Sequence, residues 1–160
     1  MNEAPTYEQL EKRVRALEQA LKTSEQHLSQ IINFLPDATF AIDTEGKVIA
    51  WNLAIQKMTG IKAREMLGKG NYEYAIPFYG DRRPIMVDLV GRWDEELQKK
   101  YCYVKRDGDS LVSETYDPLV KPGGYLWNKA SLLHGSDGQI IGAIESIRDI
   151  TEEKRMETER

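Results

Sequence analysis

Residues that could carry catalysis or hold a metal are few in this sequence and stand apart from one another. His27 and His134 are its two histidines, and neither has a Cys, Asp or Glu partner at the spacing of a metal site. Cys102 is the single cysteine, and no neighbouring base would turn its thiol into a reactive thiolate. Gly68-Lys69-Gly70 lacks the remaining residues of a phosphate-binding loop, and no pair of carboxylates is recognisable as an acid and a base. The sequence therefore predicts no catalytic residue, no metal site and no enzymatic activity for this chain.

Charge and composition narrow the choice of partners. The 160 residues carry a net charge of −4, whereas a surface for nucleic acid or anionic lipid needs a clustered basic face. No apolar run approaches the roughly 20 residues that cross a bilayer, and the N-terminus has no signal-peptide core. A single cysteine excludes an internal disulfide and is typical of a reducing compartment. We therefore expect a cytoplasmic protein in which this chain contacts neither nucleic acid nor membrane.

The elements that would position a site begin with a long helix. Apolar positions separated alternately by three and four residues predict a coiled-coil helix over residues 1–35, ended by Pro36. Arg13 would reach Glu18 of a parallel partner across the seam. We expect a homodimer; a single amphipathic helix packed on its own domain is the alternative. The expected dimer contacts are Leu10, Val14, Leu17, Leu21, Leu28 and Ile31.

Short strands and helices are expected after Pro36. ATFAID and KVIAWN predict a hairpin, and Asn52 is placed to cap the helix LAIQKMT, which Gly60 would end. AREMLG predicts a shorter helix, and two further helical pieces, IMVDLVGRW after Pro84 and DEELQKKYCYV, are expected next. Three strand patterns follow: LVSETYDPL, GYLWNKASLLH and QIIGAIESIRDI. This order predicts an α+β fold, with an antiparallel sheet and short helices on one face.

The order of elements, with these residues, resembles a PAS domain (sensory-box domain). The stretches that carry the resemblance are LPDATFAIDTEGKVIAWNLAIQKMTGIKAREMLGK and SDGQIIGAIESIRDITEEK. Their marking residues are Asn52, Ala54, Gly60, Glu65 and Gly68 in the first, and Gly138, Gly142 and Asp149-Ile150-Thr151 in the second. Lys62 departs from the family pattern, because it stands where a Ser or Thr usually caps a helix. The resemblance covers residues 31–151.

The resemblance implies a fold and a role. Members of the family have a five-stranded antiparallel sheet with short helices and a pocket between them, here expected over residues 36–151. They sense a small molecule, redox state or light, or only dimerise, and bias an effector domain. For this chain the resemblance implies a sensory module of a prokaryotic multidomain signalling protein. Its C-terminal effector would most often be a histidine kinase, with diguanylate cyclases and transcription regulators less frequent. A ligand-free dimerisation or interaction module is the alternative.

The end of the last strand is expected to carry the output. Asp149 is placed to cap a C-terminal signalling helix whose start is residues 152–160, and Glu152 would complete a capping box. No linker separates the strand from the helix, so a shift of the strand would move the helix with it. The expected relay residues are Asp149, Ile150, Thr151 and Glu152.

A ligand pocket of the kind that the resemblance implies would draw on the aromatic segment and the residues after it. Its expected walls are Tyr72, Tyr74, Phe78, Tyr79, Ile85, Met86 and Leu89, with Asn128 and Ser131 as further polar groups. Arg82 or Arg83 would anchor a carboxylate or phosphate, because a guanidinium binds such groups with two hydrogen bonds. The ligand would be a small anionic or aromatic molecule. The alternative is that the aromatic residues are core and the arginines pair with Asp81 or Asp88.

The resemblance also narrows the cofactor. GNYEYAIPF corresponds to the segment in which flavin-adduct members carry their reactive cysteine, and it has none. RPIMVDLVGRW corresponds to the helix in which haem-binding members carry their histidine, and it has none either. We therefore expect neither a cysteinyl-flavin adduct nor haem ligation by a helix histidine. A non-covalent flavin or another small organic ligand is compatible with the sequence.

Overall fold

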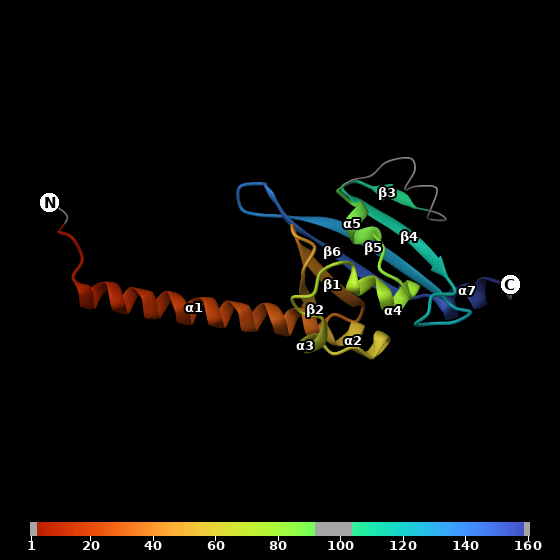
Figure 1. Cartoon of the computed structure of the whole chain (residues 1–160), viewed down its shortest axis with the longest axis horizontal. Coiled ribbons are helices and arrows are strands. Elements are labelled where there is room, and N and C mark those ends of the chain that lie inside the picture. Colours follow the sequence, from red (N-terminus) through yellow and green to blue (C-terminus); the bar gives the residue numbers. More distant parts are fainter. Residues whose placement is uncertain (1–2, 92–103, 159–160) are drawn as a thin grey trace. The chain divides into compact units, whose positions relative to one another are not determined.

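Six antiparallel strands form one sheet in the computed structural model, which describes residues 3–91 and 104–158 (Figure 1). Because β1 and β6 pair at its centre, the first and last strands of the domain lie side by side. The strands, in their order across the sheet, are β2 (Val48–Trp51), β1 (Ala38–Asp43), β6 (Ile140–Asp149), β5 (Tyr125–His134), β4 (Ser110–Tyr116) and β3 (Lys105–Asp107).

The expected count of five strands is wrong by one. The sixth strand, β3, is a three-residue edge strand that pairs with β4 across a tight turn, with Lys105 opposite Val112 and Asp107 opposite Ser110. All three β3 side chains are exposed and charged. A strand with neither alternating apolar residues nor β-branched residues has no recognisable pattern in a sequence. The other five strands lie where the sequence predicts them.

Helix α1 spans Tyr7–Phe34 and forms a unit of its own, and the chain from Leu35 onward forms the second unit. The predicted helix is therefore confirmed, and it ends two residues before Pro36. The apolar seam along it is open to solvent, with exposed fractions between 46% and 69%. Its members are Leu10, Val14, Leu17, Leu21, Leu28 and Ile31. Whether a partner covers this seam remains a prediction.

Short helices lie over one face of the sheet (Figure 1). Side chains of β5 alternate accordingly: Leu126, Asn128 and Ala130 are buried toward the helices, whereas Tyr125 and Trp127 are half-buried on the other face. A sheet packed on one face is expected to alternate in this way. The helices are α2 (Leu53–Thr59), α3 (Ala63–Met66), a 3₁₀ helix η1 (Glu73–Ala75), α4 (Ile76–Tyr79) and α5 (Met86–Leu89).

The helix expected to start at Pro84 is shorter than the sequence indicates. Ile85 is extended, with φ −125° and ψ −172°, and its N–H donates to Asp88 Oδ2 at 2.9 Å, so that α5 begins at Met86. It ends at Leu89. The residues from Arg92 to Tyr103, which include most of the second helical piece and Cys102, lie outside the described residues.

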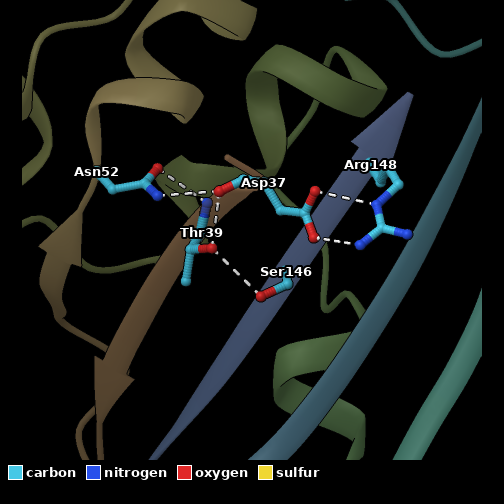
Figure 2. Close-up of polar contacts among 5 residues, drawn as sticks. All are labelled: Asp37, Thr39, Asn52, Ser146 and Arg148. Carbon is cyan, nitrogen blue, oxygen red and sulfur yellow. Dashed lines mark hydrogen bonds and ion pairs between the residues drawn. The ribbon is translucent and has the colours of Figure 1, made fainter. Parts of the chain in front are cut away.

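One buried side chain joins the start of the sheet to the first of these helices. Asn52 Oδ1 accepts from the N–H of Ile55, which caps α2 at 3.0 Å, and from the N–H of Thr39 in β1 at 2.9 Å. Asn52 Nδ2 donates to the carbonyl of Asp37 at 2.9 Å (Figure 2). The predicted cap is thus confirmed, and Gly60 ends α2 in the left-handed region at φ +77°.

We expect Gly142→Ala to destabilise the domain, because β1 and β6 approach too closely at this point for any side chain. A Cβ at Gly142 would lie 2.2 Å from the backbone carbonyl oxygen of Ile42. Backbone cannot yield as a flexible side chain can, so we expect a loss of about 1–3 kcal/mol or more in the free energy of unfolding. Urea denaturation measures it. The control is Gly70→Ala, where the nearest atom, Cγ of Lys47, is 3.6 Å away; equal losses in both variants would contradict the explanation.

Candidate functional site

Two polar side chains face each other, without full hydrogen bonding, on the helix-covered face of the sheet. Ser113 of β4 lies opposite Asn128 of β5, and only 2% and 5% of their surfaces are exposed. Asn128 Nδ2 donates to Thr115 Oγ1 at 3.3 Å. Ser113 Oγ and Asn128 Oδ1 are, in residues 3–91 and 104–158, the two buried side-chain polar atoms without a partner. Each unpaired buried group costs about 1–3 kcal/mol, so these residues are poor choices for stability alone.

A buried carboxyl group lies on the neighbouring strand, where Glu145 pairs with Ala130, two residues along β5 from Asn128. Glu145 of β6 is 2% exposed, and its Oε1 accepts from the N–H of Val87 in α5 at 2.9 Å. Burial raises its pKa to about 8; the hydrogen bond from Val87 opposes that shift, and the charge of Asp88 adds to it. At neutral pH, Glu145 is therefore mainly an uncharged carboxylic acid. It is the single buried residue of an ionisable carboxyl or basic type in the part of the chain that the structure describes.

Tyr79, the last residue of α4, adds a hydroxyl group to these polar side chains. Its pKa is raised to about 12, first by burial and then by Glu145, while a hydrogen bond with the Thr115 side chain lowers it. These effects place the Tyr79 hydroxyl near both Thr115 and Glu145. Together with Ser113 and Asn128, these residues form a polar group, here called the inner site, in which Tyr79 and Thr115 are half-buried and the others buried.

The apolar residues expected to wall a pocket are brought together in the core. Phe78, Ile85, Met86 and Leu89 are at most 5% exposed and belong to one buried cluster with Tyr74. Tyr74 is fully buried and its hydroxyl donates to Asp88 Oδ1 at 2.5 Å. Burial, followed by this hydrogen bond, raises the pKa of Tyr74. The candidate walls therefore lie on the same side of the sheet as the inner site.

The two arginines lie at the surface and bind residues that precede them in the chain. Arg82 donates to the carbonyl of Asn71 at 3.1 Å and to Glu73 at 3.3 Å. Arg83 makes two hydrogen bonds to Asp81, at 2.6 and 2.9 Å, and lies 5.1 Å from the ring centre of Tyr79. This arrangement matches the alternative in which Arg83 pairs with Asp81. It brings neither guanidinium into the buried surface.

Ser131 does not join Asn128 in the inner site, so placing them in one pocket is wrong. The two residues are three positions apart on β5, and side chains of a strand alternate between its faces. Ser131 pairs with Ile144 of β6 and with Ser110 of β4. It therefore belongs to the sheet face opposite the short helices.

An open cleft of about 560 Å³ lies elsewhere in the domain, and none of the inner-site residues lines it. Tyr72 and Tyr74 line it, together with the turn between β1 and β2 and the start of β6. Val87 and Asp88 of α5 form part of its wall, and Val87 also holds Glu145. The cleft thus reaches from the surface to the helix that covers Glu145.

The last strand passes directly into a helix (Figure 1). Helix α7 spans Thr151–Thr158, and Asp149 Oδ1 accepts from the N–H of Thr151 at 3.0 Å and from its hydroxyl at 2.5 Å. The Nζ atom of Lys121 lies 3.3 Å from Asp149 Oδ2, which makes an ion pair. Burial would raise the pKa of Asp149, but the bonds from Thr151 and the pairing with Lys121 outweigh it and lower the pKa. Asp149 thus holds the first residue of α7.

The expected capping box differs in detail. Because α7 begins at Thr151, Asp149 stands two residues before the helix and not at its N-cap position, and Glu152 is the second residue of the helix and exposed. Thr151 takes the larger role: it is buried, and its hydroxyl also accepts from the N–H of Tyr125 in β5 at 3.0 Å. The start of α7 is therefore held by β5 as well as by β6.

Sequence reasoning missed Glu145 and Ser113. Glu145 had a visible sign, since it stands between Ala143 and Ile147 at the period of two that marks the buried face of β6. Ser113 had none, because Leu111 and Val112 before it are both apolar and do not show which face of the strand is buried. Among residues 3–91 and 104–158, no group of three or more His, Cys, Asp or Glu side chains is arranged to hold a metal ion. Nor is any helix in those ranges both long and apolar enough to cross a membrane.

An antiparallel sheet with short helices over one face and a helix leaving its last strand is the architecture of a regulatory domain of the PAS type. A family model described as the PAS fold matches residues 32–155, and the chain belongs to this family.

Relatives agree with this assignment. The signal transduction histidine-protein kinase AtoS of Escherichia coli (strain K12) is 27% identical over 154 residues, which cover 95% of this chain and 22% of AtoS. This chain thus spans about a fifth of that relative. The PAS domain of Bordetella pertussis BvgS has a similar structure, with a TM-score of 0.55, 19% identity and coverage of 89% of this chain and 96% of that one. The phage VqmA–DPO complex has a TM-score of 0.54, 16% identity and coverage of 89% and 60%.

We expect the stability of the domain to depend on pH through Glu145. Its folded-state pKa of about 8 lies above the ordinary value of 4.5, so the folded state holds the proton more tightly than the unfolded state. Relative to Glu145→Gln, which stays neutral, the free energy of unfolding of the unsubstituted protein should fall as pH rises through this window. The slope is at most about 1.4 kcal/mol per pH unit. Chemical denaturation between pH 5 and 9 measures it, and parallel curves for the two proteins would contradict the assignment.

Proposed function

We propose that this PAS domain is a sensory module that binds a small uncharged ligand at the inner site and reports it through α7 to a C-terminal effector. The observation that carries the proposal is the unpaired, buried Ser113 Oγ and Asn128 Oδ1, on the same helix-covered face of the sheet as the buried Glu145. Membership of the PAS family and the histidine kinase relative support a place in signal transduction.

The chemistry of the inner site favours a neutral ligand over an anion. Asn128 Oδ1 accepts only, so it needs an N–H or O–H donor, and Ser113 Oγ either donates or accepts. Glu145 is mainly uncharged at neutral pH, and both candidate arginines are engaged at the surface. A molecule with a donor next to an acceptor fits this set, such as an amide, a lactam or a hydroxylated heterocycle. The uncharged ring of a non-covalent flavin belongs to the same class.

The proposed output runs along β6. Glu145 belongs to the inner site, and Asp149, four residues later on the same strand, holds the start of α7. Ligand binding that displaces Val87 or Glu145 would change the pairing of β6, and α7 would follow without an intervening linker. A ligand biases α7 only by the difference between its affinities for two arrangements of the domain.

The full-length protein, on this proposal, is a cytoplasmic histidine kinase, with a diguanylate cyclase as the second choice, and this chain has no activity of its own. The kinase is favoured because the AtoS relative is one. The alternative is a ligand-free PAS dimerisation module. Its supporting observation is that Met86, which faces the core, is fully buried among the protein's own side chains.

Retention of a ligand by the purified chain tests the sensory role. We expect native mass spectrometry to show a mass above 18.4 kDa per subunit, with absorption beyond the protein's own if the ligand is a flavin. Ser113→Ala should reduce this bound mass, because it removes one contact. Ser131→Ala, the same change on the opposite face of the sheet, should not. Bare polypeptide that is also not stabilised thermally by a panel of small amides, lactams and hydroxylated heterocycles would favour the ligand-free alternative.

We further propose that the chain dimerises through α1 as a parallel coiled coil. The exposed seam gives the apolar contact, and Arg13 and Glu18 flank it at positions that meet across a parallel pair. Such a seam is a common reason for association, because single apolar residues are normal at a surface whereas a continuous stripe is not.

Charge reversal tests the dimer and its direction. Arg13→Glu should weaken the dimer about two- to fivefold, because it places like charges opposite each other twice in the assembly. Arg13→Glu combined with Glu18→Arg should restore the dissociation constant. Sedimentation equilibrium at low ionic strength measures all three proteins. A monomer at every concentration, or a double variant no tighter than the single one, would contradict a parallel pair through this seam.

A further inference from the structure

A polar cluster outside the inner site joins the segment that enters the domain to the strand that leaves it (Figure 2). Arg148 of β6 donates from Nε to Asp37 Oδ1 at 3.0 Å and from Nη2 to Asp37 Oδ2 at 2.9 Å. The two residues are 111 positions apart in the chain. The Asp37 side chain is 22% exposed and that of Arg148 56%, so this is a two-bond ion pair shielded on its acidic side.

Asp37 is held firmly at its backbone as well. Its carbonyl accepts from the Thr39 hydroxyl and from Asn52 Nδ2, both at 2.9 Å. The Thr39 hydroxyl also lies 3.2 Å from the hydroxyl of Ser146 on β6 (Figure 2). Asn52 in turn caps α2. The carboxylate of Asp37 therefore stands on a fixed main chain and cannot easily follow Arg148 if β6 moves.

In the sequence, Asp37 comes shortly after α1, and Arg148 comes shortly before α7. Asp37 follows the last residue of α1, Phe34, after Leu35 and Pro36, and proline limits the backbone freedom of this short connection. Arg148 immediately precedes Asp149, which holds Thr151 at the start of α7. The Arg148 guanidinium also lies 5.4 Å from the ring centre of Trp127 on β5, which fixes its position on the sheet.

We propose that the Asp37–Arg148 pair is a clasp that couples the segment entering the domain to α7. A change that arrives along α1 then reaches the output helix by a route that does not use the inner site. The domain would combine two inputs, the ligand at the inner site and the state of whatever precedes it. A partly exposed ion pair biases an equilibrium about two- to fivefold, so the clasp adjusts the output rather than switching it. Because such coupling is reciprocal, a change at α7 must also affect the segment around Asp37.

Amide hydrogen exchange on the full 160-residue chain tests the clasp. Asp37→Asn keeps the shape of the side chain and removes its charge; we expect exchange of the α7 amides, Thr151–Thr158, to become about two- to fivefold faster. Arg148→Gln should have the same effect, and the two together should have no larger one, because each removes the same pair. Asp81→Asn, which breaks the two-bond pair with Arg83 in a surface loop, is the matched control and should leave α7 unchanged.

A second measurement tests the coupling in the opposite direction, from α7 to the start of β1. Thr151→Ala, which loosens the start of α7, should speed exchange at Ala38 and Thr39 in the unsubstituted background and not in Asp37→Asn. Glu145→Gln should leave this coupling in place, which separates the clasp from the inner site. Combining Asp37→Arg with Arg148→Asp should restore protection of α7 and shows that any loss is not general unfolding. Unchanged α7 exchange in Asp37→Asn, or an equal increase in the central strand β5, would overturn the proposal.

Discussion

The pairing of β6 with β1 on one side and β5 on the other is the constraint on which the rest of this structure depends. β6 lies in the middle of the sheet, and Gly142 brings it so close to β1 that a side chain there would meet the backbone of Ile42. One strand can then carry three different groups: Glu145 under the short helices, Arg148 on the opposite face and Asp149 at its end. β6 pairs with β1 on one side and with β5 on the other. A change in either pairing can therefore reach Asp149 at the end of the strand.

The polar groups of the domain separate into a charged outside and a neutral inside. Arg82, Arg83 and Arg148 all pair with carboxylates at or near the surface, where such pairs contribute little to stability. The inner site holds hydroxyl, amide and carboxylic acid groups, two of whose atoms have no partner. Burying such atoms is unfavourable unless something binds them. This contrast is the physical basis for a neutral ligand at the inner site and for an ion-pair clasp outside it.

Much of the fold could be predicted from local patterns, because local chemistry decides it. Asn52 and Gly60 mark the two ends of α2 to the residue, and five strands lie where alternating apolar residues and turn sequences place them. Elements whose limits depend on tertiary contacts could not be predicted in the same way. Helix α5 begins late because Asp88 binds the N–H of an extended Ile85. Strand β3 exists only through its pairing with β4.

The sites were predictable to different degrees for the same reason. The relay residues Asp149 and Thr151 are two positions apart in sequence, so their cap could be foreseen, although its register could not. The inner site depends on which face of β5 each residue occupies, and Ser131 was placed on the wrong face. Asp37 and Arg148 meet only after β1 and β6 have paired, and nothing in either local sequence indicates that contact.

The central claim is that a change at the core face of β6 reaches the start of α7. Glu145 provides such a change without any added ligand, since it loses its proton at a pH of about 8, where Asp149, whose pKa is lowered, is already ionised. The measurement is the NMR chemical shift of the Thr151 amide between pH 6 and 9.5, in the unsubstituted chain and in Glu145→Gln. The account predicts a transition of the Thr151 amide near pH 8 that Glu145→Gln abolishes. A Thr151 amide that responds identically in both proteins, or in neither, would contradict it.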